Sequence, residues 1–312
     1  MTGGHQARCR KPAAEPMCCG NIAIERGSHA ECRIDRAHAD ILGVRVDALD
    51  MNRALARIED ALVAKSKGYV CMAGVHGIME AQRNPAVLRA YADAMMIAPD
   101  GRPTAWVGHW QGHAGMRQVT GPDLMLEVFL RSEFAGYSHF LYGGKEGVAD
   151  ELAERFSRWF PWASICGTYT PPFRDLTDVE AGDLTGRIRR LKPDIIWVGI
   201  STPRQEIFMR NYLPLLETTL MFGVGAAFDF HTGRIKDCSE WIKRAGLQWL
   251  HRLMQDPRHL WKRYLRNNPA FVWKMALQIS GIRSYPTSHT AGVRLLSEPV
   301  TPRIVARKTP AD

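Results

Sequence analysis

Short runs of apolar residues recur along the middle of the chain, and the apolar residues between these runs have helical spacing. Apolar runs of about four to eight residues indicate buried strands, whereas a repeat of about 3.6 residues indicates amphipathic helices. The alternation predicts a Rossmann-like α/β fold, in which helices cover both faces of a doubly wound, mostly parallel sheet. The expected strands are 41–49, 69–75, 94–98, 139–142, 163–168, 194–200 and 219–224.

Several expected helices begin with residues that are typical of helix starts. Asp50 is expected to cap a helix that reaches about residue 67, because a side-chain oxygen at that position accepts an orphan backbone N–H. Proline suits the first turn of a helix, where its missing N–H has no partner anyway. Pro85, Pro122 and Pro203 are therefore expected near the starts of three further helices.

The expected strand at 94–98 runs directly into Pro99, Asp100 and Gly101. Proline fixes φ, Asp can bond its own backbone and Gly permits positive φ, so the sequence is typical of a turn. In an open α/β sheet, ligands bind beyond the carboxyl ends of the strands. Asp100 is therefore expected either to shape this turn or to stand at the rim of a ligand crevice.

Polar or glycine-rich turns follow other expected strands as well, and several of them on one side of a sheet would line a crevice for a polar ligand. The turn at 143–145 reads Gly-Gly-Lys and precedes a helix, so its N–H groups could cradle a phosphate. It matches neither a P-loop nor G-x-G-x-x-G, and an ordinary turn is the alternative. Small residues from Gly225 onward would let a ligand or another backbone approach closely. The polar side chains at these turns are His76, Gln205, Glu206 and Asp229.

The composition changes after Gly233. Residues 241–266 hold seven Lys or Arg, three of the nine Trp and one acidic residue, Asp256. Basic and apolar residues interleave there as in basic amphipathic helices, with a break near Asp256-Pro257. Such helices favour an anionic lipid surface, and 233–283 is expected to be a membrane-docking helical appendage to a core at 37–232. The alternative is a helix pair that packs on the core with a solvated basic face.

The whole chain has 312 residues and a net charge of +9, which favours an acidic partner such as nucleic acid, anionic lipid or a phosphorylated substrate. Nucleic acid is disfavoured because no helix-turn-helix, RRM or KH signature occurs. No apolar run reaches the roughly 20 residues of a spanning helix, so contact with a membrane is expected from its surface.

The two ends of the chain, residues 1–36 and 284–312, have little periodicity and are expected to be a disordered leader and a disordered tail. The leader contains four Cys and two His, but their spacings fit no standard zinc finger. No residue is therefore assigned as a metal ligand, and metal binding by the leader is left open. Seven Cys without a secretory apolar segment favour reduced thiols and a cytoplasmic protein.

Six short motifs occur in a fixed order between residues 40 and 275. They are Ala98-Pro-Asp-Gly101, Val119-Thr-Gly-Pro-Asp-Leu124, Gly143-Gly-Lys-x-Gly-Val-Ala149, Pro203-Arg-Gln-Glu206, Gly223-Val-Gly-Ala-Ala-Phe-Asp-Phe230 and Gly246-Leu-x-Trp-Leu-x-Arg-Leu253 with its continuation to Phe271. Each is weak alone, but together they resemble the WecG/TagA/CpsF family of glycosyltransferases.

The resemblance implies transfer of a sugar from a UDP-sugar to a polyprenyl-diphosphate-linked sugar, with inversion at the anomeric carbon. It also implies docking to the inner leaflet of the cell membrane through the C-terminal segment. The products would be cell-surface polysaccharides such as exopolysaccharide, capsule or teichoic-acid-like polymers. A homo-oligomer, the sugars and the polysaccharide are left open.

Roles for site residues follow from the resemblance together with the chemistry of transfer. Inversion needs one base to take the proton of the acceptor hydroxyl, and Asp100 matches the family's base. The leaving diphosphate needs positive charge. Because the chain has no Asp-x-Asp, metal-independent transfer is expected, with Arg252 and Arg258 closing over a diphosphate. Gln205 and Glu206 are expected to orient sugar hydroxyls, with helix capping as their alternative role.

The remaining site residues are assigned to donor and substrate contacts. Asp229 is expected to bind the nucleotide, which Gly143 and Gly144 would let approach. Two departures from the family pattern matter. The family's Thr-x-Asn position reads Met72-Ala-Gly74, so contacts there must come from His76 or from backbone. A family Arg is replaced by Gln118, and the neighbouring Arg117 is expected to substitute for it.

Two other functional classes are left open. One is an oxidoreductase that binds a nucleotide cofactor on a Rossmann-like sheet, although the missing G-x-G-x-x-G argues against it. The other is a non-catalytic module that binds a nucleotide or a polyanion. The glycosyltransferase hypothesis requires no cofactor.

Overall fold

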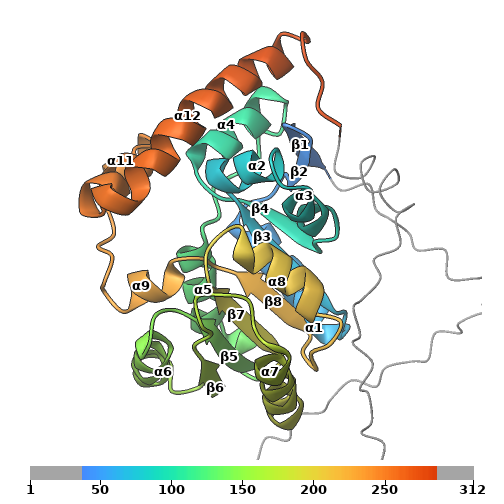
Figure 1. Ribbon diagram of the computed structural model, residues 1–312, viewed down its shortest axis with the longest axis vertical. Helices are drawn as coiled ribbons and strands as arrows, with labels where there is room; N and C mark the ends of the chain where they lie inside the picture. Colours follow the sequence, from blue (N-terminus) through green and yellow to red (C-terminus); the bar gives the residue numbers. More distant parts are fainter. Residues whose placement is uncertain (1–36, 287–312) are drawn as a thin grey trace, which may run out of the picture. The chain divides into compact units, whose positions relative to one another are not determined.

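The computed structural model describes residues 37–286, so the predicted leader (1–36) and nearly all of the predicted tail (284–312) lie outside the described residues. Within them, six strands form one sheet in the order β4-β3-β8-β7-β5-β6 (Figure 1). Every neighbouring pair is parallel, which confirms the predicted Rossmann-like α/β fold. The strands are β3 (Gly68–Ala73), β4 (Met96–Pro99), β5 (Ser138–Gly143), β6 (Ser164–Tyr169), β7 (Ile195–Gly199) and β8 (Leu220–Gly223).

Side chains alternate between the two faces of this sheet and fill two separate cores. On β3, Tyr69 and Cys71 join one core, whereas Val70 and Met72 join the other. This is the period of two that a strand imposes. One face is covered by α2 (Val75–Ala81), α3 (Pro85–Ala92), α7 (Asp178–Leu191) and α8 (Arg204–Tyr212). The other face is covered by α1 (Met51–Val63), α5 (Gly121–Leu130), α6 (Val148–Trp159) and α9 (Ala227–His231), and a short 3₁₀ helix, η1 (Ser132–Phe134), follows α5.

The strand expected at 41–49 is present only in part, at residues 44–47, and the strand before it was not expected. The structure has an antiparallel hairpin there, with β1 (His38–Ile41) paired to β2 (Val44–Asp47). The turn places Leu42 at φ 52° and Gly43 at φ 82°. Ile41, Leu42 and Val44 keep this turn apolar, so a single glycine, Gly43, is the sole interruption of the pattern between residues 41 and 44. Asp47 joins the hairpin to the main sheet, because its Oδ2 accepts the N–H of Ile97 at 2.8 Å.

Helix starts largely match the sequence. The Asp50 carboxylate accepts the N–H of Arg53 at 2.9 Å, which confirms the predicted cap of α1. Pro85 and Pro122 lie in the first turns of α3 and α5, as expected. Pro203 immediately precedes α8, as its cap residue.

Helix α4 (Arg102–Trp110) was not expected from the sequence. Its segment contains Pro103 and Gly108, which weaken the helical pattern. Pro103 is tolerated because it lies in the first turn. At Gly108 the side chain of Met116 fills the space that a larger residue would need, since a Cβ there would lie 2.0 Å from the Met116 sulfur.

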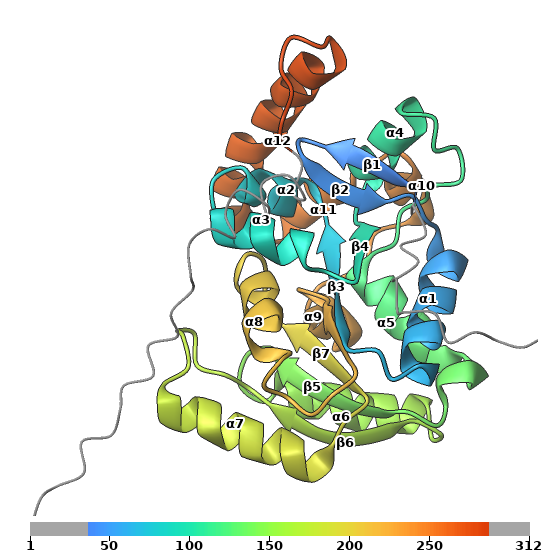
Figure 2. The same cartoon turned by 90° about the vertical axis from the view of Figure 1, so that its right-hand side faces the viewer.

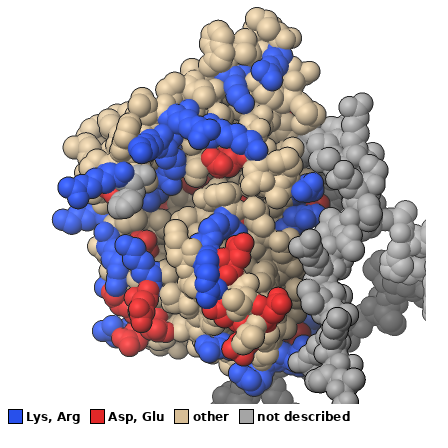
Figure 3. Space-filling view, viewed as in Figure 1, with Lys and Arg blue, Asp and Glu red and all other residues tan. Residues whose placement is uncertain are grey.

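Three helices follow the sheet: α10 (Glu240–Arg244), α11 (Gln248–Gln255) and α12 (Pro257–Ile279). Helix α11 packs on α12, and α12 packs on α2 (Figure 2). Lys and Arg side chains gather along α12 on the face shown in Figure 3. Among residues 37–286, no helix combines the length and the apolar character that crossing a bilayer requires.

Candidate active site

A cavity of about 750 Å³ lies at the carboxyl ends of β3, β4 and β8, and α11 and α12 form its opposite wall. The sequence-predicted residues that line it are His76, Asp100, Gln205, Gly225 and Arg252. Those that lie outside its lining are Arg117, Gly143, Gly144, Glu206, Asp229 and Arg258. The crevice expected along several strand ends therefore lies at the ends of β3, β4 and β8, and the turn after β5 is outside it.

Asp100 stands at the point where β4 ends, and its N–H is held by the carbonyl of Ala73 at 3.2 Å. Within residues 37–286 its carboxylate forms no hydrogen bond or ion pair, and it faces the cavity. Gly74 leaves the space for it, because a Cβ at that position would lie 3.4 Å from Asp100 Oδ2. Gly101, at φ 93°, then turns the chain into α4.

The surroundings of Asp100 change its acidity. Burial raises its pKa from 3.8 to about 6; the positive charge of Arg252 opposes the rise and the negative charge of Asp123 adds to it. A general base works best when its pKa lies near the operating pH. Asp100 is thus an ionised carboxylate at neutral pH that accepts a proton more readily than an exposed Asp.

Asp123 is a second acid in the cavity wall, which the sequence suggested only as part of a helix start. Thr120 caps α5 and donates its hydroxyl to Asp123 Oδ2 at 2.6 Å. The N-termini of α4 and α5 both border the cavity, and helix N-termini favour anionic groups. The wall around Asp100 therefore combines carboxylates with donors suited to an anion.

His76 lines the cavity but is engaged by the protein. Its Nδ1 accepts a hydrogen bond from Asn267 Nδ2 at 3.0 Å, and it also bonds the backbone of Thr202. Burial, together with the positive charge of Arg263, lowers the pKa of His76 to about 4. A neutral His76 thus joins α2 to α12. Its predicted contact with substrate stays a prediction.

Gln205 is held on three sides. Its Nε2 donates to the carbonyl of Gly223 and to Glu206 Oε1, both at 3.1 Å, and its Oε1 accepts the N–H of Gly225 at 3.0 Å. Because a carbonyl accepts and an N–H donates, these partners fix which way the amide points. Gln205 therefore ties the turn after β8 to the start of α8 while it borders the cavity.

Glu206 lies behind Gln205, fully buried. Thr202 donates its hydroxyl to Glu206 Oε1 at 2.8 Å, whereas Oε2 has no partner within the described residues. Burial raises the pKa of Glu206, and the hydrogen bonds from Thr202 and Gln205 oppose the rise. Its geometry supports Gln205, and direct contact with a sugar stays a prediction.

Two arginines of the helical wall face the cavity. Arg252, on α11, lies over the ring of Phe230 at 5.4 Å. Arg263, on α12, has a buried Nε without a hydrogen-bond partner within residues 37–286. Arg252 was predicted from the sequence as a site residue, whereas Arg263 was not, although it belongs to the last of the six motifs. Arg258, by contrast, is exposed and lies outside the cavity lining.

Arg117 is exposed and bonds the carbonyls of Ala114 and Met116, at 2.6 and 3.0 Å. Its neighbour Gln118 instead reaches the helical wall, where its Nε2 donates to Gln248 Oε1 at 3.0 Å. Gln248 lines the cavity. Gln118 therefore helps to hold α11 in place, a contact that its spacing in the sequence could not reveal.

The glycines at the ends of neighbouring strands pack against one another. A Cβ on Gly143 would lie 2.5 Å from the carbonyl oxygen of Gly199, and one on Gly199 would lie 3.2 Å from that of Gly225. These positions therefore need Gly for close backbone approach. Asp229 lies in the first turn of α9, next to Phe230 of the cavity wall. Nucleotide binding by Gly143, Gly144 and Asp229 stays a prediction.

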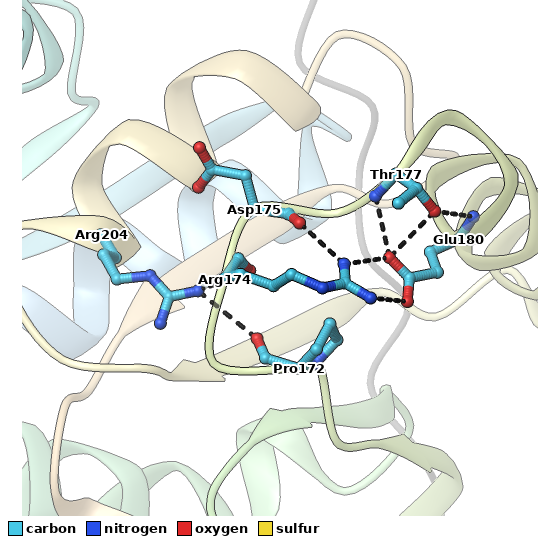
Figure 4. A network of polar contacts seen from close by, with 6 residues as sticks. All are labelled: Pro172, Arg174, Asp175, Thr177, Glu180 and Arg204. Carbon is cyan, nitrogen blue, oxygen red and sulfur yellow. Dashed lines mark hydrogen bonds and ion pairs between the residues drawn. The ribbon is translucent and has the colours of Figure 1, made fainter.

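The loop between β6 and α7 is fastened near the start of α8 by the contacts drawn in Figure 4. Arg174 forms two hydrogen bonds to Glu180, at 2.7 and 2.8 Å, and Glu180 completes a capping box with Thr177. Arg204 donates to the carbonyl of Arg174 at 2.8 Å and lies over the ring of Phe173 at 5.0 Å. Arg204 therefore holds this loop, whereas its neighbour Gln205 borders the cavity.

A family model described as "Glycosyl transferase WecG/TagA/CpsF family" matches residues 39–284. The chain belongs to this glycosyltransferase family. The match extends across the sheet, the cavity and α10–α12. It confirms the resemblance inferred from the six motifs and identifies the protein as a glycosyltransferase.

Similar curated proteins carry the name N-acetylglucosaminyldiphosphoundecaprenol N-acetyl-beta-D-mannosaminyltransferase. The Bacillus spizizenii protein (strain W23) is 26% identical over 217 residues, which cover 69% of this chain and 82% of the relative. The Bacillus subtilis protein (strain 168) is 29% identical over 181 residues, 57% of this chain and 68% of the relative. The Staphylococcus aureus protein (strain MW2) is 25% identical over 250 residues, 79% of this chain and 95% of the relative.

Proposed function

We propose that this glycosyltransferase moves a sugar from a UDP-sugar onto a polyprenyl-diphosphate-linked sugar, with inversion at the anomeric carbon. The observation that carries the proposal is the cavity, in which the carboxylate of Asp100, without a hydrogen-bond partner among residues 37–286, lies in one space with Arg252 and Arg263. The names of the relatives describe an acceptor with a sugar, a diphosphate and a polyprenol, and transfer of an N-acetylhexosamine. An N-acetylhexosaminyl donor is therefore the first choice.

In the proposed reaction, Asp100 takes the proton of the acceptor hydroxyl as its oxygen attacks the anomeric carbon of the donor. The bond from that carbon to the diphosphate oxygen breaks, and UDP leaves with the electron pair. The raised pKa of Asp100 matches this role, because burial makes its carboxylate a stronger base. Positive charge from Arg252, and donors at the N-termini of α4 and α5, would stabilise the diphosphate.

We propose that transfer proceeds without a metal ion, since these donors can neutralise the leaving group. The chain has no Asp-x-Asp, and residues 37–286 contain no cluster of three His, Cys, Asp or Glu suited to a metal. Turnover that survives excess chelator supports this part of the proposal. Turnover that chelator abolishes and Mg²⁺ or Mn²⁺ restores contradicts it.

We propose that residues 233–283 dock the enzyme on the cytoplasmic face of the membrane. Large apolar side chains are exposed there, among them those of Trp241, Met254 and Leu265. Lys and Arg side chains gather along α12 in the same segment (Figure 3). Met254→Asp combined with Leu265→Asp is expected to reduce sedimentation with anionic vesicles. Val179→Asp, an equally exposed site on α7, is the control. Equal sedimentation of the double variant and the control would contradict docking through this segment.

The activity itself is tested by UDP release from a panel of UDP-sugars, with a short-chain polyprenyl-diphosphate-linked sugar as acceptor. Acceptor-dependent UDP release by the wild type supports the proposal. UDP-sugar binding without any turnover across the panel would instead favour a non-catalytic nucleotide-binding module.

A further inference from the structure

One face of α12 borders the cavity over most of the helix. The residues of this face recur in pairs at intervals of four, which is the spacing of neighbours on one side of a helix. They are Arg263, Tyr264, Asn267, Asn268, Phe271, Val272, Met275, Ala276 and Ile279. At about 1.5 Å per residue, the face is about 24 Å long from Arg263 to Ile279.

The character of this face changes along its length. Its first two turns carry a cation, a phenol and two amides, and the remaining turns, from Phe271 to Ile279, are wholly apolar. Asn267, Phe271 and Met275 are buried against the core, but Val272 is 67% exposed and Ile279 43%. The apolar half of this face therefore packs against the core along one edge and is exposed to solvent along the other.

A second hollow adjoins the open edge and shares Asn268, Val272 and Ala276 with the cavity. Trp273 also lines it and is 66% exposed. Contiguous apolar surface of this kind marks a binding site when it is not covered by the protein itself. We call the surface formed by Val272, Trp273, Ala276 and Ile279 the α12 groove.

We propose that the α12 groove binds the first isoprene units of the acceptor's polyprenyl chain. The inference rests on the proposed function and specifies how the acceptor lies. A lipid-linked acceptor has a sugar, then a diphosphate, then a hydrocarbon chain. Asp100, Arg263 and Val272 all line this one cavity, and along α12 the cation of Arg263 precedes the apolar residues of the groove. The cavity therefore offers a carboxylate, a cation and an apolar surface to the three parts of the acceptor.

Arg263 fixes the position of the diphosphate in this arrangement. Its buried Nε has no hydrogen-bond partner within residues 37–286, and leaving a buried charged donor without a partner is costly. A diphosphate oxygen would satisfy it. The hydrocarbon leaving that diphosphate then meets Phe271 and Val272, a little more than two turns farther along the helix.

Binding is tested without turnover, by calorimetry of the full-length protein with geranylgeranyl diphosphate and with inorganic diphosphate, in the absence of vesicles. The wild type is expected to bind the prenyl compound at least about tenfold more tightly, because burial of two methylene groups already gives that factor. Val272→Asp and Ala276→Trp should remove the difference. Leu265→Asp should retain it, since Leu265 lies on α12 with the same 67% exposure but outside the cavity lining.

Equal binding of the two compounds by the wild type would overturn the groove, as would equal losses in Leu265→Asp and Val272→Asp. Measurements of sugar transfer distinguish a failure of the groove hypothesis from a failure of the proposed function. Val272→Asp should lose activity on a prenyl-linked acceptor and keep activity on the same sugar diphosphate with a methyl group in place of the prenyl chain. Selective prenyl binding by a protein that never transfers sugar would preserve the groove and refute the proposed function.

Discussion

Asn267 is the side chain whose removal should most clearly show how the helical wall is attached to the core. It is 3% exposed on α12 and bonds two residues of the α2 region. Its Nδ2 donates to His76 Nδ1 at 3.0 Å, and its Oδ1 accepts from Arg83 Nη1 at 2.9 Å. Asn267→Ala removes both bonds and leaves their partners facing an apolar methyl group.

The expected loss in the free energy of unfolding is about 2 kcal/mol. A neutral hydrogen bond contributes about 0.5–1.5 kcal/mol and one to a charged group about 1.5–3 kcal/mol, which together give about 2–4.5 kcal/mol, but water can reach part of both partners. The His76 and Arg83 side chains are each 27% exposed, and Arg83 keeps its contact with Glu80 at 3.1 Å. The expected loss in the free energy of unfolding therefore lies at the lower end of this range, at about 2 kcal/mol.

The assay is urea unfolding of the full-length protein, followed by fluorescence, with Leu265→Ala as the control on the same helix. An exposed substitution is expected to change stability by less than about 0.5 kcal/mol. Asn267→Ala should also raise the KM for the lipid-linked acceptor more than it lowers kcat, because α12 carries Arg263. Equal stability of the two variants would refute the attachment of α12 through Asn267.

Three further predictions concern the cavity. The kcat/KM profile should fall on the acid side with an apparent pKa of about 6, since a protonated Asp100 cannot accept a proton; a profile flat to pH 5 would contradict this. Arg263→Ala should reduce kcat/KM at least about tenfold, as expected for a charge-assisted bond to a diphosphate. Arg258→Ala removes the same charge outside the cavity, where solvent screens it, and should change kcat/KM by less than about twofold. Gly74→Ala should lower kcat with little effect on folding, because its Cβ would lie 3.2 Å from the carbonyl oxygen of Asp100 and would shift the residue that carries the base; wild-type kcat would refute this shift.

The sheet and the place of Asp100 could be predicted because both depend on local pattern. Buried strands such as β7 are continuous apolar runs, and the residue after a parallel strand must lie at the ligand edge. The β1–β2 hairpin was missed because Leu42, buried in the turn, continues the apolar pattern. Helix α4 was missed because Pro103 and Gly108 weaken its helical signal.

The helical wall could not be placed from sequence alone. A basic amphipathic helix has the same pattern whether its apolar face meets lipid or protein, so Phe271 and Met275 gave no sign that they are buried against the core. Arg263 was missed for the same reason, since its role depends on α12 packing on α2 beside the cavity. Arg258 and Arg263 are indistinguishable as charges in the sequence and differ only in where the helices point them.

The proposed base is tested most directly by Asp100→Asn, measured as acceptor-dependent UDP release at pH 8. The folded protein holds the proton of Asp100 up to about pH 6 and the unfolded chain only to about 4, so at pH 8 the buried charge lowers stability. The variant should therefore unfold no earlier than the wild type, with a gain of up to about 3 kcal/mol. We expect a loss of at least about a hundredfold in kcat in this well-folded variant. Turnover within a few-fold of the wild type would contradict the assignment of Asp100 as the base.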